Sequence, residues 1–177
     1  MKVKNKKKNY WILKITIATF LISVCFTLIS ELAIPNVSTI FGVFLIFIFV
    51  FIGVIFDMIG VSVTASDEAM FHSLASKKTK GAKTAIKLKK NAEKVASFCQ
   101  DVIGDICGII SGSTSAVIVL KIAEHTNKND LIVTLIVMGI VSSLTIGGKA
   151  LVKGIAMKKA DKILYRFSKI ISLFVKE

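Results

Sequence analysis

Four long apolar stretches, each nearly free of charged residues, constrain the fold of this chain more than any other feature. They run over residues 10–29, 39–63, 102–122 and 131–152. A helix needs about 20 residues to cross the hydrocarbon core of a bilayer, and each stretch meets that length. Hydrophobic residues make up 54% of the sequence and the mean hydropathy is +0.73, which is too apolar for a soluble globule of 177 residues. We therefore predict an all-α membrane protein with four transmembrane helices in a single domain over residues 1–177.

The lysine and arginine residues predict the orientation of these helices. Six lie before or at the start of the first stretch, eight in residues 77–94 and eight in residues 149–176. The two remaining basic residues, Lys121 and Lys128, lie around the connection between the third and fourth stretches. Basic residues collect on the cytoplasmic side of membrane proteins. We expect a multi-pass protein of the cell (plasma) membrane with cytoplasmic N- and C-termini.

Two segments outside the apolar stretches are predicted to lie along the membrane surface. Residues 64–100 form a basic, helical cytosolic loop. Residues 155–175 space their apolar side chains as an amphipathic interfacial helix does, after a break expected at Gly147 and Gly148. The formal net charge of +13 is placed beside membrane spans, so we expect anionic lipid headgroups and no nucleic acid as its partners.

Aspartates inside the apolar stretches are the residues most suggestive of function. Asp57 lies in the second stretch, and Asp101 and Asp105 lie four residues apart at the start of the third. An aspartate deep in a span costs about 2.5–3.5 kcal/mol even on the lenient insertion scale, so it normally faces a cavity, a partner or an ion. Carboxylate oxygens suit hard cations such as Mg²⁺. The alternative is that the acids, with Asp67 and Glu68, pair with nearby lysines or are solvated at the interface.

Two further features of the sequence bear on function: a row of glycines in the third stretch, and the absence of catalytic motifs. Gly104, Gly108 and Gly112 form a row that favours close helix packing. His72 and His125 are predicted to lie on opposite sides of the membrane, and no hydrolase, zinc or nucleotide-binding motif is present in the sequence. We therefore do not expect an enzyme.

Several segments, in order, resemble the transmembrane module of the CorB/CorC and cyclin M (CNNM) family of Mg²⁺ transport proteins. Residues 64–69, TASDEA, are similar to a motif of the SGxETA type that ends a span in the family. Gly81 and Ala82 lie in a basic loop, as in the family, and Asp101 and Asp105 fall where the family carries paired polar residues. Residues 148–153, GKALVK, resemble a degenerate GExxPK motif that precedes a membrane-lying helix.

The resemblance implies a homodimeric module with a divalent-cation site between spans. Thr64, Asp101, Asp105 and Gly148 would fall at or near that site. The chain departs from the pattern at Lys149, where the family has glutamate, and at Val152, where it has proline. The family's cytosolic CBS pair has no counterpart in these 177 residues, so we expect a short relative without it.

Three functions remain open on these grounds. The first is binding, and transport, of a Mg²⁺- or Co²⁺-type divalent cation by Thr64, Asp101 and Asp105, with Asp57 lining the path and Gly148 beside it. The second is a non-transporting scaffold or regulatory subunit that docks a partner through its glycine-rich span. A holin-like protein would fit the size and charge but leaves the buried acids unexplained.

Overall fold

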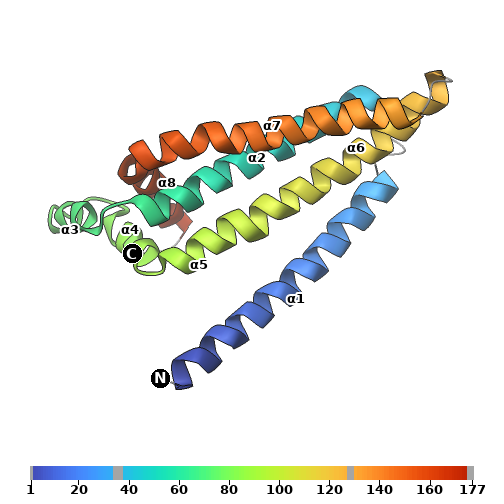
Figure 1. The fold of residues 1–177 in the computed structure, drawn as a ribbon. Helices are drawn as coiled ribbons and strands as arrows, with labels where there is room; N and C mark the ends of the chain where they lie inside the picture. Colours follow the sequence, from blue (N-terminus) through green and yellow to red (C-terminus); the bar gives the residue numbers. More distant parts are fainter. Residues whose placement is uncertain (1, 34–37, 127–129, 175–177) are drawn as a thin grey trace. The chain divides into compact units, whose positions relative to one another are not determined.

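The structure is a computed structural model that describes residues 2–33, 38–126 and 130–174, all of them helical or in short turns. Four helices are long and the others short (Figure 1). In chain order they are α1 (Lys2–Ala33), α2 (Thr39–Ala65), α3 (Glu68–Ser76), α4 (Ala82–Lys90), α5 (Ala92–Ser97), the π-helix η2 (Phe98–Gly104), α6 (Asp105–Thr126), α7 (Asp130–Lys158) and α8 (Ala160–Phe174). No strand occurs in these three ranges, which confirms the all-α prediction for them.

Three helical segments of the described chain are long and apolar enough to cross a membrane. They are Thr39–Ala65, Ala92–Ile122 and Leu131–Lys158, with 27, 31 and 28 residues. At 1.5 Å per residue, each exceeds the hydrocarbon thickness of about 30 Å. Leu13–Ile29, inside α1, is a shorter apolar segment. The third of the predicted spans is longer than expected, because α5, η2 and α6 follow one another directly from residue 92.

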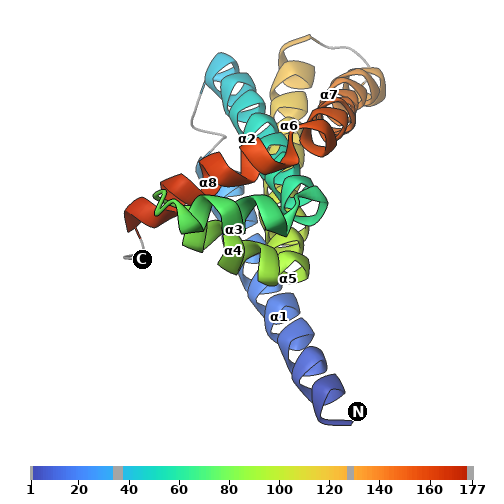
Figure 2. The same ribbon diagram turned by 90° about the vertical axis from the view of Figure 1, so that its left-hand side faces the viewer.

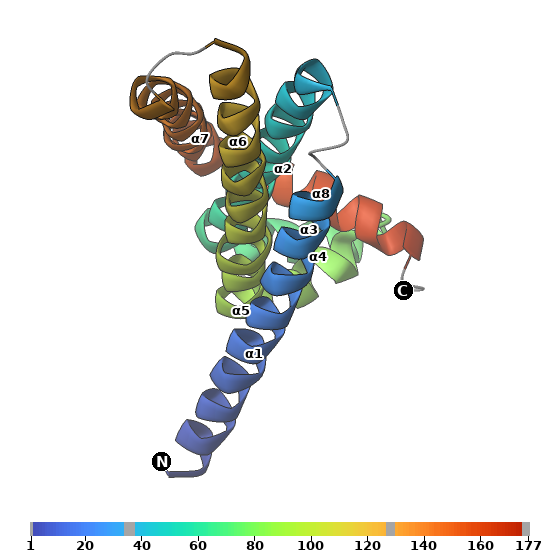
Figure 3. The same ribbon diagram turned by 90° about the vertical axis from the view of Figure 1, so that its right-hand side faces the viewer.

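Contacts divide the chain into two compact units. The first consists of Met1–Val50 and Asp105–Ser143, and the second of Phe51–Gly104 and Leu144–Glu177. In the first unit α1 packs along α6 (Figure 3). Ser111, Thr114 and Ser115 of α6 are buried. The hydroxyls of Ser111 and Ser115 donate to carbonyls one turn earlier in α6, which satisfies these polar groups without water.

The second unit has a hydrophobic core where the end of α2 meets the short helices. Its buried members are Ile59, Val63, Phe71, Ala85, Cys99 and Leu164, which come from α2, α3, α4, η2 and α8. Figure 2 shows α8 lying along α4, with α3 beside α4. Gly81 permits this close packing because its φ of +86° suits glycine, and a Cβ there would lie 2.9 Å from the Cα of Lys169. The short helices are therefore anchored to the end of α2.

The break before the last helix lies later than the sequence suggested. The prediction of a break at Gly147 and Gly148 was wrong, because α7 continues to Lys158 and α8 begins at Ala160. The buried stripe of α8 is Ala160, Leu164 and Ser168, spaced four residues apart. Ile170, one of the apolar side chains of this amphipathic segment, is 55% exposed.

Candidate cation site

Three helices of the second unit, α5, η2 and α7, come close to α2 at what we call the three-helix junction. A Cβ on Gly60 of α2 would lie 2.6 Å from Cγ of Gln100 in η2 and 3.2 Å from the carbonyl oxygen of Ala96. A Cβ on Gly148 of α7 would lie 3.0 Å from Cγ2 of Val54 in α2. Glycine is therefore the residue that lets α5, η2 and α7 come so near to α2 at these two places. The junction comprises Val54, Asp57, Gly60, Gln100, Gly104, Gly148 and Lys149.

Asp57 lies between the two contacts of the junction. It follows Val54 by three residues and precedes Gly60 by three, so it is on the face of α2 between the side that meets α7 and the side that meets η2. Its side chain is half-buried. Other helices approach α2 on either side of this carboxylate, and the cavity or ion role suggested for it by the sequence stays a prediction.

Lys149 brings a positive charge to the same junction. Its side chain is half-buried, and its Nζ lies 3.7 Å from the place of a Cβ on Gly104. A larger residue at 104 would compete with the ammonium group for this space. The junction therefore contains one acid from α2 and one base from α7.

Thr64 lies two turns after Asp57 on the same face of α2, close to the helix end. Its Oγ1 donates to the carbonyl oxygen of Val61 at 2.8 Å. Its own carbonyl oxygen accepts from Nζ of Lys89 at 2.8 Å. The carbonyl oxygen of this predicted site residue is thus bound by an ammonium group in the structure.

Asp101 and Asp105 have exposed side chains. Asp101 is in the π-helix η2 and accepts a hydrogen bond of 2.6 Å from Oγ of Ser97. π-helical turns are rare and are frequent at functional sites. Asp105 is the first residue of α6 and belongs to the other unit.

The acids that follow α2 have local structural roles. Asp67 caps α3, accepting from the backbone N–H of Ala69 at 3.0 Å, and Glu68 pairs with His72 at 3.2 Å. Among the described residues, no three His, Cys, Asp or Glu side chains are grouped so that they would hold a metal ion by themselves. A cation here would need oxygens from the backbone or water beside Asp57.

Two of the three glycines in the row of the third span have open space beside them in the described part of the chain. No atom of the described residues lies within 4 Å of a Cβ placed on Gly108 or Gly112, apart from the helix itself. A Cβ on Gly104, the first of the row, would lie 3.5 Å from the carbonyl oxygen of Cys99 and 3.7 Å from Nζ of Lys149.

Comparison with protein families matches residues 44–176 to the cyclin M transmembrane N-terminal domain, CNNM. This match covers most of the chain. The chain belongs to the CNNM transmembrane domain family. The resemblance inferred from the motifs at residues 64–69, 101–105 and 148–153 is confirmed, and the protein is a membrane protein. Comparisons with curated proteins and with solved structures gave no significant match.

The matched region of this CNNM domain contains the whole junction, whereas α1 lies entirely before it. Of the five predicted site residues, the structure places Asp57 and Gly148 in the junction and Thr64 on the same face of α2. Gly60, Gln100 and Lys89 were not identified from the sequence. The signal for Gly60 was present, since a glycine one turn after an intramembrane aspartate suggests a close helix contact.

Proposed function

We propose that this CNNM domain binds a hard divalent cation, of the Mg²⁺ or Co²⁺ type, at the three-helix junction and moves it across the cell membrane. The observation that supports this most is the half-buried carboxylate of Asp57 between two close helix contacts. Mg²⁺ keeps several waters and is commonly bound by one or two carboxylates, so a single aspartate with backbone oxygens is a sufficient start. Opposite charge from the ion would offset the cost of a carboxylate inside the span.

The remaining predicted residues receive supporting roles in this proposal. Gly148 lends a backbone oxygen on the junction side of α7, and Thr64 lends its hydroxyl oxygen, because its carbonyl oxygen is bound by Lys89. Asp101, exposed on η2, attracts cations from the cytoplasm, and Asp105 does the same at the start of α6. Carboxylates at the mouth of a pathway raise the local concentration of cations.

The membrane arrangement that goes with this function has four spans, with α1 as the first, and both termini in the cytoplasm. The lysines before residue 15, in residues 77–94 and after residue 148 support it, because they would then all lie on one side. A homodimer would give the row of Gly104, Gly108 and Gly112 a partner.

Flux measurements on reconstituted protein test the proposal. Full-length protein is placed in liposomes with an internal Mg²⁺ indicator, and Asp57→Asn is compared with the wild type. We expect flux to fall at least tenfold in Asp57→Asn, with weaker Mg²⁺ binding in titration calorimetry. Glu93→Gln, which removes the same charge from an exposed position on α5, is the matched control and keeps wild-type flux. Equal flux and binding in Asp57→Asn and Glu93→Gln would reject the site.

A second function, a non-transporting scaffold or regulatory subunit, is favoured by Lys149. Its ammonium group is a tethered positive charge in the junction, and like charges repel a divalent ion there. This function predicts wild-type liposomes without Mg²⁺ flux, and one membrane partner in stoichiometric amount when the chain is isolated from its native membrane.

A further inference from the structure

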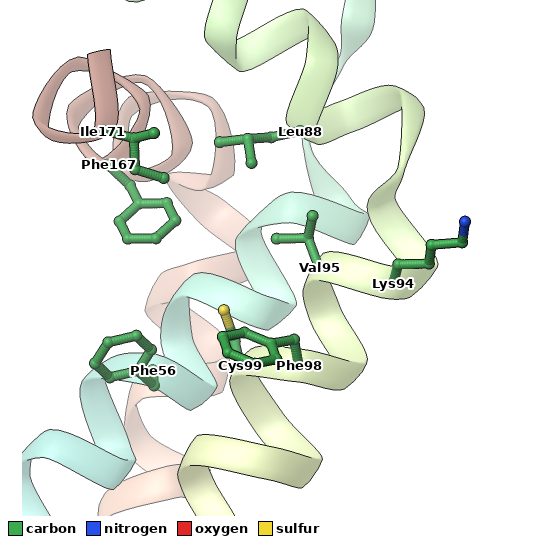
Figure 4. A pocket seen from close by; sticks show the side chains of 8 residues that line it. All are labelled: Phe56, Leu88, Lys94, Val95, Phe98, Cys99, Phe167 and Ile171. Carbon is green, nitrogen blue, oxygen red and sulfur yellow. The ribbon is translucent and has the colours of Figure 1, made fainter. Parts of the chain in front are cut away.

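An apolar pocket lies in the second unit beside the core of the short helices. Its volume is about 280 Å³. Figure 4 shows its walls, which include Phe56 from α2, Phe98 and Cys99 from η2, and Phe167 and Ile171 from α8. Apolar walls of this kind favour contact with hydrocarbon over contact with water. The pocket is close in size to the smaller ligand sites of proteins, which begin at roughly 300 Å³.

The pocket opens to the surface of the unit next to one charged residue. Phe98 is 51% exposed, so a ligand has access there. Lys94 of α5 also lines the pocket, and Figure 4 shows its side chain extending outward from the rim. A lysine can line an apolar space with its methylene groups while its ammonium group stays at the polar surface.

A second, basic pocket adjoins the first at Lys94. It has a volume of about 250 Å³ and is formed by the turn between α4 and α5, residues 89–94. Three lysines and one glutamate line it, so it is positively charged. Lys89 is held by the carbonyl groups of α2, which leaves Lys90 and Lys94 as its outward-facing cations. Neither Lys90 nor Lys94 forms an ion pair within 4.0 Å with a described residue.

We propose that these adjoining pockets form a binding site for one anionic phospholipid of the surrounding membrane. An acyl chain enters the apolar pocket between η2 and α8, and the phosphate lies on Lys94 and Lys90. A hydrocarbon tail joined to a negative head matches an apolar cavity joined to a basic one, and a membrane protein meets such molecules at every surface. A water-soluble anion would leave the apolar pocket empty.

The site would connect lipid composition to the short helices. A bound acyl chain contacts α2, η2 and α8 together, so it would stabilise the packing of α8. This proposal does not depend on cation binding, since none of the lining residues belongs to the three-helix junction.

Native mass spectrometry of the full-length protein tests this site. Protein in detergent is offered phosphatidylglycerol and phosphatidylcholine with the same acyl chains. We expect one phosphatidylglycerol per chain to be retained, with at least tenfold preference over phosphatidylcholine. Lys94→Glu should lose this preference, whereas Lys162→Glu, the same charge change at an exposed position on α8, should keep it. Equal retention of both lipids by the wild type, or an unchanged preference in Lys94→Glu, would overturn the proposal.

A fluorescence experiment locates the acyl chain independently of the charge. The native tryptophan is removed as Trp11→Phe, and Phe98→Trp places a reporter at the opening of the apolar pocket. Phosphatidylglycerol with brominated acyl chains, at low fraction in phosphatidylcholine bilayers, should quench this reporter more strongly than brominated phosphatidylcholine does. A reporter at Leu173, an exposed apolar residue of α8, should be quenched equally by both. Equal quenching at position 98 would place the lipid elsewhere and reject the site.

Discussion

The ammonium group of Lys89 donates a hydrogen bond of 2.8 Å to the carbonyl oxygen of Thr64. A second bond of 3.2 Å goes to the carbonyl oxygen of Val63. Both oxygens belong to the last turn of α2, where carbonyl groups have no partner within the helix. A side chain from α4 therefore caps the helix that carries Asp57. Its positive charge also interacts favourably with the negative end of the helix dipole.

Replacing this lysine should destabilise the protein. We expect Lys89→Met to keep the methylene packing, lose the cap, and lower stability by about 1 kcal/mol, the usual size of one net hydrogen bond. Thermal unfolding of the full-length protein in detergent measures this as a lower Tm. Lys87→Met, two residues away and exposed, is the control. Equal Tm values for the two variants would mean that the cap contributes nothing.

Enlarging Gly60 should separate α2 from η2. Gly60→Val would place a side chain 2.6 Å from Cγ of Gln100 and 3.2 Å from the backbone oxygen of Ala96, and the backbone cannot move aside as a side chain can. Overpacking of this kind costs about 1–3 kcal/mol. Gly154→Val on α7 is the control, because no atom of the described residues outside the helix lies within 4 Å of a Cβ there. The expected result is a lower Tm for Gly60→Val than for Gly154→Val.

Asp161 should hold the start of α8 in place. Its Oδ1 accepts from the backbone N–H of Asp67 at 2.8 Å, across 94 residues of sequence, which ties α8 to the turn between α2 and α3. We expect Asp161→Ala to cost about 1 kcal/mol, because the N–H loses its partner. It should also speed proteolysis of α8 at Lys162 and Arg166 by trypsin. The control is Ser172→Ala, because the hydroxyl of Ser172 donates to the carbonyl oxygen of Lys169 within α8. This variant should be cleaved at the wild-type rate.

Sequence patterns predicted the helices of this chain better than their contacts. Long apolar runs bounded by lysines determine a spanning helix locally, so α2 and α7 were expected close to their observed positions. The break at Gly147 and Gly148 was wrong because glycine is tolerated inside membrane helices, and Gly148 serves the contact with Val54 instead. Which oxygen Lys89 would bind depends on how the short helices fold back on α2. No local pattern contains that information.

Removing the positive charge of Lys149 should strengthen cation binding at the junction. The ammonium group of Lys149 repels a cation in the junction, and Coulomb's law makes this repulsion twice as large for a divalent ion as for a monovalent one. We therefore expect Lys149→Met to bind Mn²⁺ at least tenfold more tightly than the wild type, and Lys149→Glu more tightly still.

Titration of Mn²⁺ into the purified full-length protein, followed by electron paramagnetic resonance, gives the affinities. Lys153→Met, one turn later on α7 and exposed, removes the same charge outside the junction and should change the affinity less than twofold. Combining Lys149→Met with Asp57→Asn should return the affinity toward the wild-type value. The loss of the attraction by the carboxylate would then offset the loss of the repulsion by the ammonium group. If Lys149→Met and Lys153→Met gave the same affinity, the ammonium group would not face the cation and the junction would lose its role as the binding site.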